Sequence, residues 1–391
     1  MKNWGCGAAG SALEWHSRGH GFDPRQLHFC LQGVSLNWLA PFFSCCSKEI
    51  VLNILAALGF NYSCKKPETI FLCRDSGMGD LLLIAPTIVA LKKKFPKAKV
   101  TFACRKGIYS DIIANDPNIF KIVPLDQEFM RPRSKNVIKY IKRKLGYWKN
   151  RFLYNIKYDL VVFFFDYSSA WNLRKHMIDQ FSEKAGVVIS ERRPILYLNE
   201  EDSLQGDEIL RKLGIREKEI FIVLGYETGI KGIAPHKHCR RSWNGFPELV
   251  KKIKQKYKIK ILTLLPKTSE DGPPGTISVK DTPTIRSKAA IIKRCSLYIG
   301  VDCGLTQIAS TFDFKMISIH SSKKEQRSNR TTIEMYGSLS PNTQFFSRPS
   351  LDNENDKSTS EQVFMDNIMA EVENSLQNIG LSQSASEKIS R

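Results

Sequence analysis

Apolar residues in the first half of the chain fall into short runs separated by amphipathic and glycine-containing stretches. Four runs predict buried parallel strands, at residues 68–74, 98–105, 120–125 and 158–165. Residues 80–95 carry apolar side chains at helical spacing and predict a helix that Pro96 ends. A shorter helix is expected within 107–119. Strand and helix in alternation predict a doubly wound parallel sheet.

The second half repeats this arrangement from about Glu219 onward. It predicts strands at 220–226, 259–266, 296–302 and 315–320, and helices at 246–257, 284–295, 305–312 and 361–380. The length of 391 residues is enough for two domains with separate cores. We therefore expect an α/β protein with two Rossmann-like domains that face a cleft. The expected divisions are an N-terminal extension of uncertain order at 1–66, a first domain at 67–204, a second domain at 205–350, and a polar linker, helix and tail at 351–391.

Each half contains one glycine turn between an apolar strand and a helix. In the first turn Ser76, Gly77 and Gly79 precede Asp80, and the second turn spans residues 302–304. Free backbone N–H groups at such a helix start suit a phosphate. Taken alone, each acid is better explained as a helix cap. Two such turns at the carboxyl ends of strands, in domains that face each other, predict a ligand cleft.

Composition narrows the class of partner. The formal net charge of +20 favours anionic partners, namely nucleic acid, phosphorylated sugars or an acidic lipid surface. The ten cysteines are scattered without zinc-site spacing, which favours a reducing cytoplasmic setting. No stretch reaches the roughly 18 apolar residues of a membrane span, and no signal-peptide pattern opens the chain, so we expect no translocation. His236, His238 and Cys239 are more typical of a solvated loop than of a metal site.

Three blocks of the sequence carry a resemblance. They are "RDSGMGDLLLIAPTIVALKKKFPKAKVTF", "IIANDPNIFKIVPLD" and "CSLYIGVDCGLTQIAS". In this order, over roughly residues 68–375, the chain resembles the family 9 glycosyltransferases, which are lipopolysaccharide heptosyltransferases of GT-B architecture. The resemblance implies an inverting, metal-independent transfer that needs no cofactor. The implied donor is a nucleotide-activated heptose in the form of an ADP-sugar, and the implied acceptor is a lipid-linked saccharide or lipopolysaccharide core.

The resemblance also implies residue roles. Asp80 matches the family's acid after the glycine and would be the general base that takes the acceptor hydroxyl proton. Ser76, Gly77 and Gly79 would form the acceptor-side turn. Residues 302–304 match the family's Asp-Thr-Gly segment at the donor phosphates. The implied donor-binding residues are Asp302, Cys303, Gly304, Thr306, Gln307 and Arg241.

Three positions depart from the family pattern, which has Thr at Cys303, His at Gln307 and Lys at Arg241. Arginine keeps the charge but offers a planar fork instead of a point donor. Gln307 can bond a sugar or a phosphate but cannot carry a proton. Two alternatives therefore stay open. One is a catalytically altered module that binds sugar nucleotides or membranes, and the less favoured one is a basic nucleic-acid-binding protein.

The basic segment 131–151 contains nine Lys and Arg residues and no acid. Val137, Ile141 and Leu145 recur at helical spacing, so one face is apolar and the rest is basic. Such a helix suits an anionic inner-membrane surface, although packing of its apolar face on the sheet explains the pattern equally well. No nucleic-acid recognition motif accompanies the charge. We expect a cytoplasmic protein, with peripheral attachment to the inner face of the cytoplasmic membrane as a further expectation.

Overall fold

The computed structural model describes residues 66–125, 153–164, 175–226, 243–267, 269–321, 331–349 and 357–381, with a few single residues between 138 and 149. The chain divides into two units, residues 1–65 with 131–160 and residues 66–130 with 161–391. In the first unit, residues 153–157 are helical, as are Ile141 and Leu145 of the basic segment, whose side chains are exposed. The two sheets belong to the second unit, with β4 beginning at the boundary.

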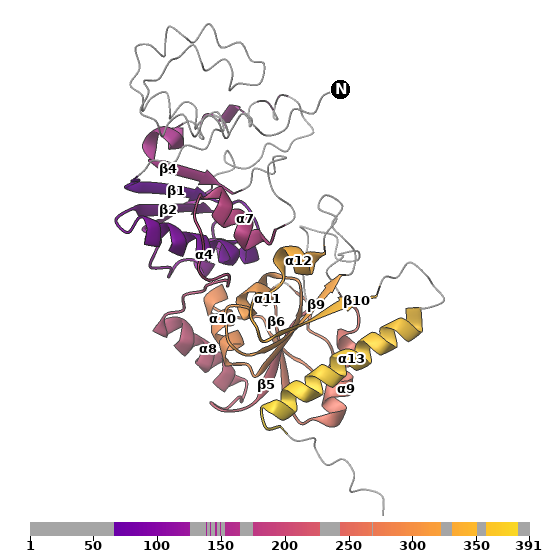
Figure 1. The fold of residues 1–391 in the computed structure, drawn as a ribbon. Helices are drawn as coiled ribbons and strands as arrows, with labels where there is room; N and C mark the ends of the chain where they lie inside the picture. The colour runs from indigo at the N-terminus through magenta and orange to yellow at the C-terminus, as the bar shows by residue number, and fades with distance from the viewer. Residues whose placement is uncertain are drawn as a thin grey trace, which may run out of the picture. The chain divides into compact units, whose positions relative to one another are not determined.

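The first sheet has the strand order β3-β2-β1-β4 (Figure 1). Its strands are β1 (Thr69–Cys73), β2 (Lys99–Cys104), β3 (Lys121–Pro124) and β4 (Leu160–Phe163). The pairings of β2 with β1 and β3 are parallel, with Ile70 opposite Val100. The helices of this region are α4 (Met78–Lys94), α5 (Ile108–Ile112) and α7 (Met177–Lys184). Residues 81–88 of α4 are all buried, because α4 packs against α7 as well as α11 of the second sheet's region.

The second sheet has the order β10-β9-β8-β5-β6-β7, and its pairings are all parallel. Its strands are β5 (Phe221–Gly225), β6 (Lys260–Leu264), β7 (Ile277–Val279), β8 (Leu297–Val301), β9 (Lys315–Ser321) and β10 (Thr343–Arg348). Its helices are α8 (Glu200–Lys212), α9 (Phe246–Lys256), α10 (Ile285–Arg294), α11 (Gly304–Ala309), α12 (Thr332–Tyr336) and α13 (Lys357–Asn378). Figure 1 shows α9 and α13 on one side of this sheet and α8 and α10 on the other.

The two faces of the second sheet are packed differently. On one face, α9 and α13 bury an apolar core with the strands, in which Ile299, Leu249 and Ile368 are fully buried. On the other face, α8 lies so close to α10 that a Cβ on Gly206 would be 2.7 Å from the Cβ of Ala290. Parallel strands covered on both faces are buried along their whole length, which explains their continuous apolar runs.

The predicted α/β class with parallel sheets is confirmed, and the predicted strands agree with the observed ones to within one or two residues. The sequence analysis did not predict α7, α8, β7, α12 or β10. Residue 204, the expected domain boundary, lies inside α8, and α13 begins within the polar run that was expected to be a linker. In the described parts of the chain, every helix is too short or too polar to span a bilayer.

Candidate functional site

The first glycine turn leads from the carboxyl end of β1 into α4. Gly77 is the helix N-cap, in an extended conformation with φ −63° and ψ 158°, and Asp80 lies in the first turn of the helix. The backbone N–H of Asp80 already donates to Gly77 O at 3.1 Å. The alternative reading of Asp80 as the N-cap is therefore wrong, because its carboxylate is not used to cap α4.

Two donors hold the Asp80 carboxylate. Arg74 donates from Nη2 to Oδ2 at 2.7 Å, and the Ser76 hydroxyl donates to the same oxygen. The Arg74 side chain is only 2% exposed, donates to Phe164 O and lies over the ring of Phe181 at 5.1 Å. No described residue donates to Oδ1 of Asp80, whose side chain is 18% exposed. Asp80 is thus fixed through one oxygen, and the other remains available to a ligand.

Arg74 was missed by the sequence analysis. It is the first residue after β1 and stands six positions before Asp80. A basic residue at the end of an apolar strand is a weak signal, since most such residues are solvated. The burial of Arg74 in the structure explains its pairing with Asp80, because a buried guanidinium requires a carboxylate or several carbonyl partners.

The second glycine turn leads from the carboxyl end of β8 into α11. Cys303 is the helix N-cap, and no side chain caps the first N–H groups of α11. Asp302 is only 4% exposed, yet it contributes to the cavity wall with Cys303 and Gly304. Burial raises the pKa of the Cys303 thiol, so the thiol stays protonated at neutral pH although the residue is partly exposed.

The side chains of Thr306 and Gln307, which were expected to bind the donor, form hydrogen bonds within the protein. The Thr306 hydroxyl donates to Val301 O and lies 3.0 Å from the hydroxyl of Tyr298, and Thr306 does not line the cavity. Gln307 does line it, and its Nε2 donates to Tyr336 O at 2.6 Å. Oε1 of Gln307 is buried without a hydrogen-bond partner. One N–H of the Gln307 amide is thus used within the fold, and the amide nitrogen keeps a second N–H donor.

The two turns approach each other closely, and glycine is what permits this. A Cβ on Gly79 would lie 2.8 Å from Cγ of Gln307, and a Cβ on Gly304 would lie 2.6 Å from Cε of Met78. A Cβ on Gly77, by contrast, would meet no atom within 4 Å. The helices that follow the two turns, α4 and α11, pack against each other.

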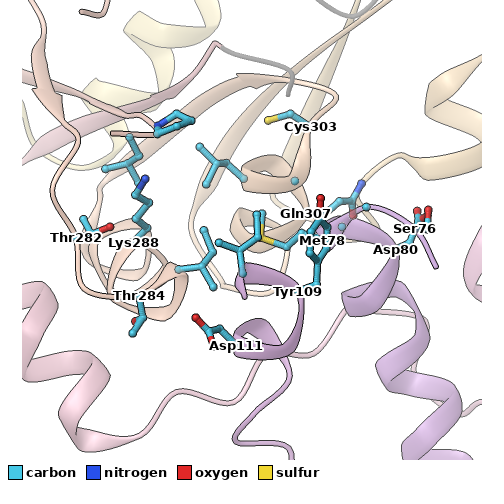
Figure 2. A pocket seen from close by; sticks show the side chains of 18 of the residues that line it. Ser76, Met78, Asp80, Tyr109, Asp111, Thr282, Thr284, Lys288, Cys303 and Gln307 are labelled. Carbon is cyan, nitrogen blue, oxygen red and sulfur yellow. The ribbon is translucent and has the colours of Figure 1, made fainter. Parts of the chain in front are cut away.

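A cavity of about 740 Å³ lies at these turns. Figure 2 shows Ser76 and Asp80 at one end, and Thr282, Thr284 and Lys288 at the other. The second end is formed by the residues after β6 and β7 and by the start of α10. Lys288 donates to Leu265 O at 2.6 Å. The volume is that of a site for a drug-sized or nucleotide-sized ligand, at the strand ends where such ligands bind in open parallel sheets.

Other predicted site residues lie outside the described residues. These are Arg241 and the group His236, His238 and Cys239. Of the other predicted residues, all but Thr306 line the cavity, namely Ser76, Gly77, Gly79, Asp80, Asp302, Cys303, Gly304 and Gln307. Across the described ranges, no three His, Cys, Asp or Glu side chains are grouped to hold a metal ion.

The fold and the cavity define an α/β protein with two parallel sheets and a ligand site at the carboxyl ends of β1 and β8. No family model matches the sequence, and no curated protein does. The fold matches a solved structure of a family 9 glycosyl transferase from Veillonella parvula, with a TM-score of 0.57 at 14% identity, over 81% of this chain and 100% of that one. This likeness establishes that the chain has the fold of that glycosyltransferase.

Two further solved structures are similar at lower scores. The ADP-heptose lipopolysaccharide heptosyltransferase II of E. coli has a TM-score of 0.49 at 11% identity, over 76% of this chain and 98% of that one. The E. coli heptosyltransferase WaaC with ADP has a TM-score of 0.46 at 12% identity, over 76% and 99% of the two chains.

Proposed function

We propose that the protein is an inverting glycosyltransferase of two-domain, GT-B type that moves a sugar from a nucleotide-diphosphate donor to an acceptor hydroxyl. The observation that carries the proposal is the Asp80 carboxylate, which is held through one oxygen at the end of a nucleotide-sized cavity that the second glycine turn also lines. The fold shared with the Veillonella parvula glycosyl transferase supports it. The sequence resemblance makes an ADP-activated heptose the donor and a lipid-linked or lipopolysaccharide-core saccharide the acceptor.

The chemistry follows from the placement of Asp80. Oδ1 of Asp80 takes the proton of the acceptor hydroxyl while the hydroxyl oxygen attacks the anomeric carbon of the donor. The bond from that carbon to the diphosphate breaks, and the electron pair leaves with the diphosphate. Attack from the side opposite the leaving group inverts the anomeric centre. Backbone N–H groups of the second turn and the Arg241 cation would stabilise the charge on the diphosphate.

The experiment has two stages. Thermal unfolding of the purified chain is first measured with ADP, UDP, GDP and ADP-heptose, since a ligand at one hundred times its Kd stabilises by about 2.7 kcal/mol. Transfer from the best donor is then measured with lipid-linked saccharides, with and without EDTA. Stabilisation and EDTA-resistant transfer support the proposal. Absence of stabilisation by every nucleotide contradicts it, and transfer that stops in EDTA contradicts the metal-independent mechanism.

A catalytically altered nucleotide-sugar-binding module is the second candidate. The departures at Gln307 and Cys303 favour it, above all the first, since a glutamine amide cannot carry a proton as the family's histidine can. Stabilisation by a nucleotide without transfer to any acceptor would identify this function. Salt-sensitive binding to DNA or RNA, without nucleotide-sugar binding, would identify the less favoured nucleic-acid-binding protein.

We further propose peripheral binding to an anionic membrane surface through the basic segment 131–151. Ile141 and Leu145 are helical and have exposed fractions of 50% and 66%, as expected for apolar residues available to a lipid interface. Sedimentation with vesicles that contain anionic lipid tests this. Binding that is lost on raising the salt concentration supports the proposal, and equal partition onto neutral vesicles contradicts it.

A further inference from the structure

His176 is a buried histidine that connects the regions of the two sheets. It is the N-cap of α7, is only 6% exposed, and its Nδ1 accepts from the backbone N–H of Ile178 at 3.3 Å. Its Nε2 lies 3.0 Å from the carbonyl oxygen of Gly337, the residue that follows α12. His176 thus joins α7, which packs against α4, to the chain between α12 and β10. The mechanism proposed above does not use this residue.

The two partners of His176 fix its protonation state. A backbone N–H can only donate, so Nδ1 carries no proton, and a backbone carbonyl can only accept, so Nε2 carries one. His176 is therefore neutral when both bonds are made. A second proton, on Nδ1, would face the N–H of Ile178 and remove the cap of α7. If the ring turned to avoid this, Nε2 would lose the carbonyl of Gly337.

The end of α12 that His176 bonds is next to the wall of the cavity. Tyr336 lines the cavity, and its carbonyl oxygen accepts from Nε2 of Gln307 at 2.6 Å. The consecutive carbonyls of Tyr336 and Gly337 are thus bonded by two helices, the first by α11 and the second by α7. Consecutive peptide units are planar and share one Cα atom, so a shift of one carbonyl moves the other. His176 therefore acts on the Gln307 side of the cavity without lining the cavity itself.

Charged groups on α4, α7 and α12 surround this contact. The lysines at the end of α4 lie far from His176, because Lys94 donates to Gly186 O, beyond the last residue of α7. The acids of these elements are already bonded to cations or to N–H groups, so they offer little compensation for a buried imidazolium. The groups are the pairs Lys175–Glu183, Arg192–Asp179 and Arg74–Asp80, together with Lys184 of α7 and Glu334, which accepts from Thr331 N.

His320 of β9 is the other histidine in the part of the chain that the structure describes, and it differs from His176 in its partners. Its Nε2 lies 2.8 Å from the hydroxyl of Ser318, and its Nδ1 lies 2.9 Å from the hydroxyl of Thr332. A hydroxyl can donate or accept, so these two contacts do not require one charge state. His320 is therefore a buried histidine near α12 whose bonds can persist when it is protonated.

We propose that neutral His176 positions the Gln307 side of the cavity by holding Gly337, and that protonation of His176 releases this contact. With the contact made, the folded chain takes up the proton less readily than the unfolded chain. The contact is therefore complete at neutral pH and is lost as the pH falls through the ordinary histidine range, about 6.5. The inference concerns the cavity wall, and only its ligand measurement rests on the proposed function.

Asparagine and glutamine separate the two bonds of His176. His176→Asn keeps an acceptor near the position of Nδ1, and so can cap α7, but has no group at the position of Nε2. His176→Gln keeps an N–H donor that extends toward Gly337 O, and neither amide titrates. Two quantities are measured on the full chain at about pH 7.5 and about pH 5.5, on either side of the histidine range. They are the hydrogen-exchange protection of residues 331–340, relative to an unstructured peptide at the same pH, and the affinity for ADP by calorimetry.

Comparison of variants with wild type at equal pH cancels the titration of ADP itself. At the higher pH we expect His176→Asn to lower both quantities about tenfold, as for one buried hydrogen bond, and His176→Gln to lower them much less. At the lower pH the wild type should approach His176→Asn, and His176→Gln should exceed the wild type. His320→Asn is the matched control, because it removes the other buried histidine near α12. It should keep the wild-type change between the two pH values.

Several outcomes would overturn the inference. Equal protection of residues 331–340 in wild type and His176→Asn at the higher pH would do so, as would a wild-type pH dependence that persists in both His176 variants. A pH dependence that disappears in His320→Asn would assign the effect to the other histidine. If ADP does not bind, the proposed function fails, and the exchange measurement alone still supports or overturns the role of His176. If ADP binds and exchange does not change with pH in the wild type, only this inference is overturned.

Discussion

The two glycine turns share a plan, an apolar strand that ends at a helix start with an acid nearby, and they differ in what surrounds the acid. Asp80 in the first turn is held by Arg74 and Ser76 and keeps one oxygen without a described donor. In the second turn Asp302 is 4% exposed, and the thiol of Cys303 stays protonated. The same local motif thus provides a carboxylate with one oxygen open to a ligand in one place, and a closely packed turn in the other.

The first turn should therefore show the largest effect on catalysis. Asp80→Asn keeps the shape of the side chain but cannot take a proton, so we expect turnover to fall by about 10² to 10⁴. Nucleotide binding should persist, since the donor is assigned to the second turn. Turnover and nucleotide affinity are measured on the same preparation. If Asp80→Asn retains more than a tenth of the activity, Asp80 is not the general base, and the proposed difference between Asp80 and Asp302 is wrong.

The ion pair beneath Asp80 should give the next largest effect. Arg74→Ala removes one partner of a pair that is 2% and 18% exposed, and we expect a loss of about 3–5 kcal/mol in the free energy of unfolding. Denaturant unfolding measures this loss. The control is Arg105→Ala, whose pair with Asp75 is 39% and 16% exposed and should contribute about 0–1 kcal/mol. Equal losses in the two variants would contradict a special role for Arg74.

Alanine substitutions at Gly77, Gly79 and Gly304 test which of these glycines is needed for the close approach of the two turns. Gly79→Ala places a Cβ 2.8 Å from Cγ of Gln307, which is fixed by its bond to Tyr336 O, so we expect a loss of about 1–3 kcal/mol. Gly304→Ala meets only the mobile end of Met78 and should cost less. Gly77→Ala, with open space around it, should be close to neutral. Thermal unfolding of the three variants ranks their losses of stability. A large loss in Gly77→Ala would contradict the expected ranking.

The smallest effect concerns the thiol of the second turn. Because burial raises the pKa of Cys303, its alkylation by iodoacetamide at pH 8 should be at least about tenfold slower than that of free cysteine. The rate should rise only as the pH passes above the ordinary thiol range. Mass spectrometry of the modified peptide measures it. Rapid alkylation of Cys303 at pH 7 would indicate a thiolate and make this turn chemically active.

The elements that the sequence predicted well are those whose apolar pattern is strong and local. Residues 81–88 and the strands β1, β5 and β8 are buried almost continuously, so their runs stand out from the polar turns. The missed elements have weak patterns. β7 has three residues, β10 is a partly exposed edge strand, and α8 buries Asp202, Gly206 and Leu210 while it exposes Leu204. The contact of Gly206 with Ala290 lets α8 pack closely on α10, and the sequence analysis did not single this glycine out.

The residues alone were sufficient for the parallel α/β class and the two glycine turns, because strand runs and glycine turns depend on neighbours in the chain. The choice of Asp80 as general base came from the family resemblance. The pairing of Arg74 with Asp80 and Phe164, the contact of Gly79 with Gln307, and the hydrogen bond of His176 to Gly337 emerged only in the folded chain. Most of these contacts join residues far apart in sequence. Their energies come from burial and geometry that no local pattern records.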